Sequence, residues 1–531
     1  MRSIRLSVPA LTLSVAAAVS LTACGGGSDS SGDGASKYVD GGTFTMSESS
    51  DPGALDPQGG VGSALFQLTQ FAYDNLVALD GDGNIQSELA SSWNVDGKTV
   101  TFDLNDGVTC SDGSAFTAQT AADNIAYVEN PKNKSPFLGV YVPAGAKASA
   151  SGSTLTVKLA SPSPFVLSQF ASLPMVCDSG LKDRASLKTE TAGTGPYVLS
   201  EAVPGDHYTY TVRDDYTWGP GGASTSESGT PAKIVVKIVQ NETTAANELL
   251  AGTLNSTQII GPDAQRLEAQ NLFHTSTEAM IGEQWYNHAD GHATSDAAVR
   301  TALTQALDLD ALAKAVTSGL GTVPTQLTVL PPTVCTYDAT TGNLPSNDTS
   351  AAASTLESAG YTKGSDGVYA KGGKPLSITF LVDSGLGTGG SAGAELAVKA
   401  WKDLGVDVQL KQQDTAAMQG VLFGTGNWDV AWEPINVSTP DQIVPFLSGA
   451  TLAKGGTNFA SIDNPDYTSA TGQAMSMNGS EGCDTWKSAE VALYKAADIV
   501  PFAANVIPTF GKGATFEVTG SLVPTSIRML G

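Results

Sequence analysis

The sequence is poor in positive charge, with 28 Lys and Arg against 53 Asp and Glu among its 531 residues, and its formal net charge is −25. Because phosphate backbones are bound by clustered Lys and Arg, this balance excludes nucleic acid as a partner. The acidic surplus itself is typical of a solvated surface and does not identify a ligand. Beyond the first 23 residues the chain lacks a run of eighteen or more apolar residues, so we expect no membrane-spanning segment in its body.

Cysteine is also scarce, with five residues in all. Cys24 ends the stretch LTAC, which follows two arginines and an apolar segment too short for a spanning helix, a pattern typical of a secretory signal. The stretch resembles the lipobox of bacterial lipoproteins, in which the cysteine carries lipid; the alternative is the cleavage site of an ordinary exported protein. We therefore expect a signal peptide over residues 1–23, a flexible Gly/Ser tether over 24–37, and a lipid anchor on Cys24 that holds the protein to the cell membrane, outside the cytoplasm.

The other four cysteines of an exported protein can form disulfides. Four cysteines allow three sets of pairs. We predict that Cys110 pairs with Cys177 and Cys335 with Cys483, because each couple falls within one of the chain segments assigned below.

Strand and helix patterns are mixed along the chain. Apolar and polar residues alternate in TVTFDL and TLTVKLA, which predicts strands with one buried face. Helices are expected to begin after Thr117, to end at Gly252 and Gly405, and to break near Asp308. A strand over LSITFLVD is followed by SGLGTGGSAG, which we interpret as a glycine loop. The predicted fold class is therefore mixed α/β.

The glycine loop gives the sequence its best enzyme pattern. Gly385, Gly387 and Gly390 have the GxGxxG spacing of a dinucleotide site, with Asp414 placed to bind a ribose hydroxyl. Such a cofactor belongs inside the cell, whereas this chain is expected outside it, so we predict no cofactor. A flexible turn whose exposed amides point into a cleft explains the glycines more simply.

The same loop contains a second catalytic pattern. Gly389, Ser391 and Gly393 have the GxSxG spacing of a nucleophile elbow, which needs a histidine partner for the serine. All four histidines precede it, but other chain orders exist among serine enzymes. An exported enzyme built on residues 385–393 is therefore the alternative to a binding protein.

Two histidines raise the question of a metal site. His288 and His292 are four residues apart in WYNHADGHA, a spacing that on a helix could place two ligands on one metal. Gly291 and the lack of helical periodicity favour a surface loop, so we predict no metal site.

Several stretches resemble, in the same order, the bacterial extracellular solute-binding proteins of family 5, which include oligopeptide-, dipeptide- and nickel-binding components of ABC importers. The resemblance covers nearly the whole mature chain. The matching stretches are LDP at 55–57, LASSWNVDGKTVTFDLNDGVTCSDGSAFTAQTAADNI, GTGPY from Gly193, VRDDYTW from Val212, VRTALTQALDLDAL from Val299, AGY from Ala359, DGVY from Asp366, and KAWKDLGVDVQL followed by WDVAW.

The resemblance implies a two-lobed periplasmic-binding-protein-like fold of the cluster C type, with an extra domain in the first lobe. It implies a discontinuous lobe 1 over 38–75, 191–277 and 505–531, an inserted domain over 76–190, and a lobe 2 over 278–504. It also implies no catalysis: the protein, expected to be a monomer, captures a small solute and presents it to a permease whose ATPases are separate chains. A non-transport envelope receptor with the same fold is a third possibility.

In this family the loop after the WDVAW-like strand lines the pocket, and peptide binders commonly place an aspartate there to meet the ligand's α-ammonium. Alignment on Pro440 and Asp441 puts Asn436 at that position, with Glu433 as the nearest upstream acid. Trp432 is the predicted wall residue, and a buried structural tryptophan is the alternative. An amide can accept a hydrogen bond from an ammonium but adds no charge. Oligopeptides or dipeptides are expected first as ligands, with sugars, opines and metal chelates behind.

Three other places supply candidate ligand-binding residues, and core packing is the alternative for the aromatic ones. The candidates are Trp285, Tyr286 and Asn287 at the end of a strand, Gly387 and Ser391 at a helix start that favours anionic or carbonyl groups, and Ser47 and Ser50 after the first strand.

Overall fold

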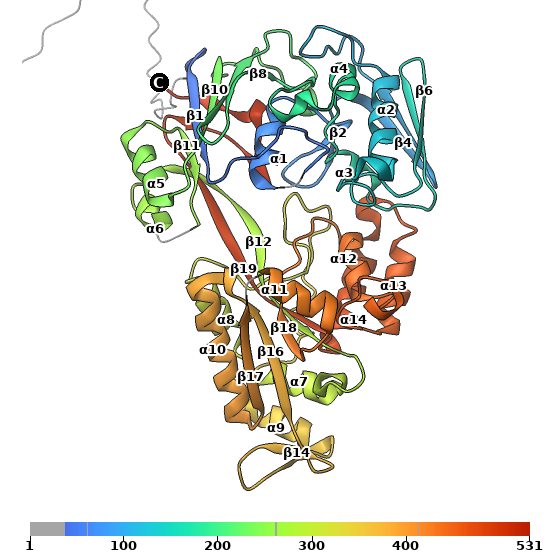
Figure 1. Ribbon diagram of the computed structural model, residues 1–531, viewed down its shortest axis with the longest axis vertical. Helices are drawn as coiled ribbons and strands as arrows, with labels where there is room; N and C mark the ends of the chain where they lie inside the picture. Colours follow the sequence, from blue (N-terminus) through green and yellow to red (C-terminus); the bar gives the residue numbers. More distant parts are fainter. Residues whose placement is uncertain (1–37, 61, 261–262, 414) are drawn as a thin grey trace, which may run out of the picture. The chain divides into compact units, whose positions relative to one another are not determined.

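The computed structural model describes residues 38–531 except 61, 261–262 and 414 (Figure 1). The predicted signal peptide, the tether with Cys24, and Asp414 lie outside the described residues. Residues 38–531 form one unit of mixed α/β class.

A ten-stranded mixed sheet runs through this unit. Its strands, in spatial order, are β17 (Asp407–Gln413), β16 (Ser377–Asp383), β18 (Val430–Trp432), β12 (Phe273–Tyr286), β19 (Ile499–Gly511), β11 (Ser256–Gln258), β1 (Thr43–Glu48), β10 (Lys233–Ile238), β9 (His207–Val212) and β8 (Tyr197–Val203).

The two long central strands, β12 and β19, join the two parts of the sheet (Figure 1). They are antiparallel, and their pairs run from Phe273 opposite Gly511 to Trp285 opposite Ile499. We call the part with β11, β1, β10, β9 and β8 lobe 1. The part with β18, β16 and β17 is lobe 2, which also contains helices α7 to α14.

In each lobe, the carboxyl ends of the parallel strands face the other lobe. In lobe 1, β1 is parallel to β10 and β11, and β11 is antiparallel to β19. In lobe 2, β16 is parallel to β17 and β18, and β18 is antiparallel to β12. Because β12 runs from lobe 1 to lobe 2 and β19 runs back, β1 ends on the side facing lobe 2, and β16 and β18 end on the side facing lobe 1.

A separate four-stranded antiparallel sheet forms an insert in lobe 1, with the order β4, β5, β7, β6. Val100 and Phe102 of β5 are buried, as their alternation predicted, in a core that continues into lobe 1. A disulfide joins Cys110 to Cys177 in this core. The elements of the insert are β2 (Val77–Leu79), β3 (Ile85–Ser87), β4 (Ala90–Asp96), β5 (Thr99–Leu104), β6 (Lys147–Ser151), β7 (Thr154–Lys158), α2 (Ala118–Glu129), α3 (Val166–Phe170) and α4 (Asp178–Lys182).

Most of the remaining helices belong to lobe 2, where a second disulfide joins Cys335 to Cys483. Lobe 1 has α1 (Ser63–Gln70), α5 (Glu242–Ala251) and α6 (Asp263–Glu268). Lobe 2 has α7 (Ala297–Gln305), α8 (Leu309–Val316), α9 (Thr349–Ser358), α10 (Gly387–Leu404), α11 (Thr415–Gly420), α12 (Pro440–Leu447), α13 (Pro465–Ala474) and α14 (Cys483–Lys495).

The helix ends confirm the local sequence predictions. The Thr117 hydroxyl accepts a hydrogen bond from the Thr120 amide at 3.1 Å at the start of α2. Asp308 caps α8 in the same way after the break from α7. Gly252 and Gly405 end α5 and α10 in the left-handed region, with φ of 77° and 111°.

The predicted glycine loop is wrong, because α10 begins at Gly387 within it and continues to Leu404. The glycines instead allow α10 to pack closely on the end of α8. A Cβ at Gly389 would lie 2.3 Å from the Val316 carbonyl oxygen, and one at Gly393 would lie 2.5 Å from the Val316 side chain. The sequence run therefore reflects close helix packing rather than a flexible turn.

Candidate functional site

The candidate site is the region between the strand ends that face each other from the two lobes. In open α/β sheets, ligands bind outside the carboxyl ends of the strands. Asp383 is the last residue of β16, Glu433 directly follows β18, and Glu48 is the last residue of β1. The region is therefore acidic on both sides, and sequence reasoning named only Glu433 of these three residues.

Glu433 is a half-buried carboxyl beside a second one. Burial raises the pKa of Glu433 to about 7, and the Asp383 carboxylate adds to this shift. The Glu433 backbone is fixed to β12, since its amide donates to the Glu283 carbonyl at 3.1 Å and its carbonyl accepts from the Trp285 indole at 2.8 Å. A carboxyl whose ionisation is opposed in this way is stabilised by a cationic partner. The pair can anchor an ammonium or guanidinium group.

Glu283 lies on β12, between the lobes, with no exposed surface. Its Oε2 accepts hydrogen bonds from the Ile435 amide at 2.9 Å and the Trp285 indole at 3.1 Å. Its Oε1 has no hydrogen-bond partner among the described residues. Burial raises the pKa of Glu283 to about 8, and the Glu433 carboxylate contributes. Sequence reasoning missed this residue because a single acid in a strand gives no signal of its burial.

On the lobe 1 side, the end of β1 supplies a further acid and two serines. Burial raises the pKa of Glu48 to about 7. Ser47 is buried and donates its hydroxyl hydrogen to Thr257 Oγ1 at 2.8 Å, so its hydroxyl is used within lobe 1. Ser50 is exposed. Of the two predicted serines, Ser50 is the one with surface to offer a solute.

Asn436 uses its side-chain amide to hold the central strand β12. Its Oδ1 accepts from the Met280 amide at 2.7 Å, and its Nδ2 donates to the Met280 carbonyl at 3.0 Å. The pairing of β12 with β19 shifts register just after Met280. An aspartate could accept the first bond but could not donate the second. The pair of hydrogen bonds to Met280 therefore gives a physical reason for an amide at position 436, where the resemblance leads us to expect an acid.

The predicted aromatic wall residues lie in the core in this structure. Trp432 has no exposed surface, and its ring packs on Phe380 and Phe502 with centroid distances of 5.1 and 4.7 Å. Trp285 is also fully buried and packs on Phe459 at 4.7 Å. Neither ring reaches a solute in this conformation, which is the core-packing alternative of the sequence analysis.

The neighbouring polar candidates at the end of β12 and directly after it are also held internally. The Tyr286 hydroxyl lies 2.8 Å from Thr304 Oγ1 and has no exposed surface. Asn287 donates to the Gly426 and Trp428 carbonyls at 3.1 and 2.9 Å. The Tyr286 contact fixes the end of β12 to α7, and the Asn287 bonds fix the residue after β12 to the loop before β18.

The predicted nucleophile elbow is not formed. Ser391 lies inside α10, where its hydroxyl donates to the Gly387 carbonyl at 3.1 Å and accepts from Gln412 Nε2 at 3.0 Å. An elbow instead needs the serine on a sharp turn between strand and helix, next to a histidine base. Each of the four histidines contacts other groups. Gly387 begins α10 just after β16, at the same sheet edge as Asp383.

His288 and His292 have different partners. His288 is largely buried, with its Nε2 3.8 Å from Asp498, and burial lowers its pKa to about 3. His292 Nδ1 lies 3.1 Å from Asp429 Oδ1. Within the described ranges, no three His, Cys, Asp or Glu side chains are grouped as a metal ion would require.

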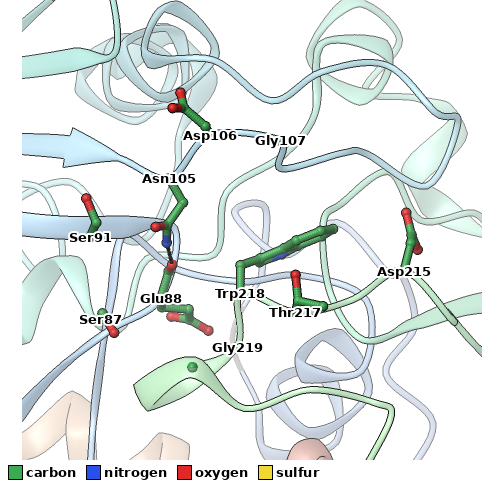
Figure 2. Close-up of a pocket in the computed structure, with 11 residues that line it drawn as sticks. Ser87, Glu88, Ser91, Asn105, Asp106, Gly107, Asp215, Thr217, Trp218 and Gly219 are labelled. Carbon is green, nitrogen blue, oxygen red and sulfur yellow. Dashed lines mark hydrogen bonds between the residues drawn. The ribbon is translucent and has the colours of Figure 1, made fainter.

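A separate polar cavity of about 450 Å³ lies where the insert meets lobe 1 (Figure 2). Its lining includes the Trp218 indole, the buried Glu88, Asp106 and Asp215. The Trp218 ring is held in place, since its Nε1 donates to Asp74 Oδ2 at 3.0 Å.

The residues around this cavity explain one stretch of the family resemblance. In VRDDYTW, Arg213 pairs with Asp215 at 3.2 Å, and the Tyr216 hydroxyl donates to Asp74 Oδ1 at 2.8 Å. Trp218 bonds the same carboxylate. Arg213 also donates to the Thr109 carbonyl of the insert at 3.0 Å and to the Thr109 hydroxyl at 2.6 Å, so the stretch fixes the insert to lobe 1.

Comparisons with known proteins identify the class that this fold and site define. Residues 84–453 match the family model "Bacterial extracellular solute-binding proteins, family 5 Middle". The match covers more than half of the chain, so the chain belongs to this family of solute-binding proteins, which are not enzymes. The fold is the cluster C type of periplasmic binding protein, as the family resemblance implied.

Particular relatives agree over most of the chain. The oligopeptide-binding protein OppA of Bacillus subtilis is 24% identical over 92% of this chain and 91% of its own length. A substrate-binding protein from Microbacterium hydrocarbonoxydans, solved with 4-hydroxybenzoate hydrazide, is 27% identical, with a TM-score of 0.68 over 92% of this chain and 99% of that one. AppA of Bacillus subtilis, solved with a nonapeptide, is 18% identical, with a TM-score of 0.65 over 94% of this chain and 100% of that one.

Family membership makes the chain an extracytoplasmic solute-binding protein. In the part that the structure describes, none of the helices has the length and apolar character needed to cross a membrane.

Proposed function

We propose that this protein is the lipid-anchored solute receptor of an ABC importer and captures its solute by closing its two lobes. The family match and the two-lobed sheet support the receptor role. The LTAC stretch at Cys24 supports the anchor. The tether keeps the captured solute near the permease, which raises its effective concentration there. The ligand stabilises the closed form over the open one.

The proposed solute is an oligopeptide or dipeptide whose α-ammonium group is bound by Glu433 and Asp383. The observation that carries this proposal is the acidic pair at the carboxyl ends of β18 and β16, in a half-buried setting that raises the pKa of Glu433 to about 7. Asn436 keeps its amide on Met280, so the positive group is met by the upstream acid instead. The oligopeptide-binding relative supports peptides as the solute class.

Thermal unfolding of the full chain in detergent, with and without peptide, tests this function. Trialanine with a free amino group and N-acetyl-trialanine are compared on the wild type, Glu433→Gln and Asp383→Asn. A ligand at about a hundred times its Kd adds about 2.7 kcal/mol of stability. We expect stabilisation of the wild type by trialanine and a much smaller effect of the acetylated peptide.

The variants separate the anchor from the solute class. Glu433→Gln and Asp383→Asn should lose most of the trialanine effect, whereas Asp82→Asn, an exposed acid in the insert, should keep it. Equal stabilisation by both peptides would contradict the carboxylate anchor. Sugars, opines and metal chelates are compared in the same assay, and stabilisation only by these would contradict peptides as the solute. No stabilisation by any peptide, sugar, opine or chelate would favour a non-transport receptor.

A further inference from the structure

We call β12 and β19, which join the two lobes, the hinge strands. The insert and lobe 2 also meet at a contact that involves neither of these strands. Phe165, which precedes α3 in the insert, has 1% of its surface exposed. It shares one hydrophobic cluster with Cys335, Ala474 and Trp486, which belong to lobe 2. We call Phe165 the plug and the group of Cys335, Ala474 and Trp486 the socket.

The plug is seated by a ring contact and a hydrogen bond. The ring centroids of Phe165 and Trp486 are 6.1 Å apart. The Gly479 amide of lobe 2 donates to the Pro164 carbonyl of the insert at 2.8 Å. This bond crosses from one part of the molecule to the other, so it can form only when the two parts are together.

Interactions within the insert and within lobe 2 fix the conformations of the plug and the socket. On the insert side, Ser163 donates its hydroxyl hydrogen to Gln169 Oε1 at 3.1 Å, which fixes the segment before α3. On the lobe 2 side, the Cys335–Cys483 disulfide ties the loop that contains Cys335 to the start of α14. Neither surface has to reorganise for the plug to seat, which limits the entropy lost in the contact.

A second contact lies beside the first on the same loop of lobe 2. The turn between β2 and β3 of the insert places Gly83 against the backbone of Thr333 and Val334. A Cβ at Gly83 would lie 2.3 Å from the Thr333 carbonyl oxygen. Gly83 also has a φ of 81°, in the left-handed region.

These contacts complement the hinge. The strands β12 and β19 join the lobes by continuous chain, whereas the plug joins them by contact alone, between α3 and the helices α12 to α14 (Figure 1). Separating the lobes breaks the Gly479–Pro164 bond and exposes an aromatic ring, while the paired hinge strands can remain intact.

We propose that seating of Phe165 in the socket holds the two lobes closed, so that Phe165 is a positioning residue that sets solute affinity without touching the solute. This regulation of affinity rests on the proposed function, but the closing contact itself does not. Burial of a Phe side chain is a large apolar contribution, so losing it should shift the closed population, and hence any affinity that needs closure, by about tenfold or more.

The test compares two variants that open the contact in different ways, each with a matched control. Phe165→Ala removes the plug, and Phe116→Ala truncates a buried Phe in the insert core instead. Gly83→Asn places a wedge against Thr333 in a turn that asparagine tolerates. Gly97→Asn makes the same change at a positive-φ glycine of the insert, with a φ of 57° and no atom within 4 Å of an added Cβ.

Small-angle X-ray scattering and hydrogen exchange at the Gly479 amide are measured on the full chain without ligand. We expect Phe165→Ala and Gly83→Asn to increase the radius of gyration and to speed Gly479 exchange at least tenfold, and the two controls to match the wild type. An unchanged radius of gyration in both test variants overturns the proposal, even if Gly479 exchanges faster. If Phe165→Ala does not fold, Gly83→Asn decides alone.

Titration of the same proteins with trialanine separates this proposal from the function. Weaker trialanine binding by Phe165→Ala than by Phe116→Ala, by about tenfold, supports the affinity role. Equal affinities in proteins that differ in radius of gyration overturn that role. If trialanine binds to none of the proteins, the peptide proposal fails, while scattering still decides whether the plug holds the lobes.

Discussion

Asn436 of lobe 2 pairs with both backbone groups of Met280 on the hinge strand, at 2.7 and 3.0 Å. The side chain takes the place of a neighbouring strand at a point where β12 shifts its register against β19. The loop after β18 is thereby attached to the hinge, and the acid Glu433 on that loop is held in place as well.

Asn436→Asp should lower stability rather than create an ammonium site. A carboxylate loses the bond to the Met280 carbonyl and places two oxygens against each other, so the free energy of unfolding should fall by about 1–3 kcal/mol. Urea unfolding measures this change. Asn94→Asp, at an exposed asparagine of β4, is the control and should change little. A variant as stable as the wild type would show that the bond to Met280 contributes nothing.

Glu283 should make the protein less stable as the pH rises. Its pKa is raised from 4.5 to about 8 by burial, so its stabilising contribution is complete below about pH 4.5 and is lost as the pH rises through about 8. Glu433 and Glu490, each with a pKa raised to about 7 by burial, act in the same direction. We expect the free energy of unfolding to fall between about pH 5 and about pH 8.

Substitution of Glu283 isolates its share of this pH dependence. Glu283→Gln keeps an acceptor for the Ile435 amide and removes the charge, so it should flatten the profile and unfold at higher denaturant concentration than the wild type at about pH 8. Glu278→Gln, at an exposed acid of the same strand, should leave the slope unchanged. A parallel profile for Glu283→Gln would contradict the role of this carboxyl.

Gly389→Ala should destabilise the protein although alanine is a better helix former. The added Cβ would lie 2.3 Å from the Val316 carbonyl oxygen, so α10 must move away from α8. We expect a loss of about 1–3 kcal/mol. Gly472→Ala in α13, where nothing lies within 4 Å, should instead gain about 0.5–1 kcal/mol. Calorimetric melting of both variants measures the difference. Stability changes of the same sign in the two variants would refute the packing explanation of the glycines.

Trialanine affinity should increase as the pH rises through the pKa of Glu433. Burial raises the pKa of this carboxyl to about 7, so it becomes increasingly ionised above that pH. A peptide amino group stays protonated to about pH 7.5. Isothermal titration at about pH 6 and about pH 7.5 should show tighter binding at the higher pH, with proton release. Glu433→Gln should bind weakly at both values. Affinity that falls with pH would rule out Glu433 as the anchor.

Features with a local cause could be predicted from the sequence. The caps at Thr117 and Asp308 and the helix stops at Gly252 and Gly405 follow from residue types at fixed offsets, and all four are present. The alternation in β5 likewise predicted which side chains are buried. The ordered family stretches gave the fold, because several weak matches in one order constrain topology together.

Features that depend on distant contacts could not be predicted. Gly389 packs on Val316, a residue far back in the chain, so the sequence pattern alone cannot distinguish this close helix packing from a loop. Trp432 ends the short strand β18, and the sequence of such a strand end looks the same whether its aromatic residue is buried or lines a pocket. Glu283 gave no signal, since its raised pKa arises from burial in the folded molecule.

The antiparallel pair β12 and β19 has a mechanical consequence. Two strands bonded along their length resist stretching and sliding, because either motion breaks many hydrogen bonds at once, but they bend and twist at small cost. The register shifts on either side of Gly282 interrupt this ladder and bend the strand locally. Such a pair of strands allows one lobe to rotate relative to the other but opposes sliding of the lobes past each other. The proposed opening and closing would therefore be mainly a change in the angle between the lobes.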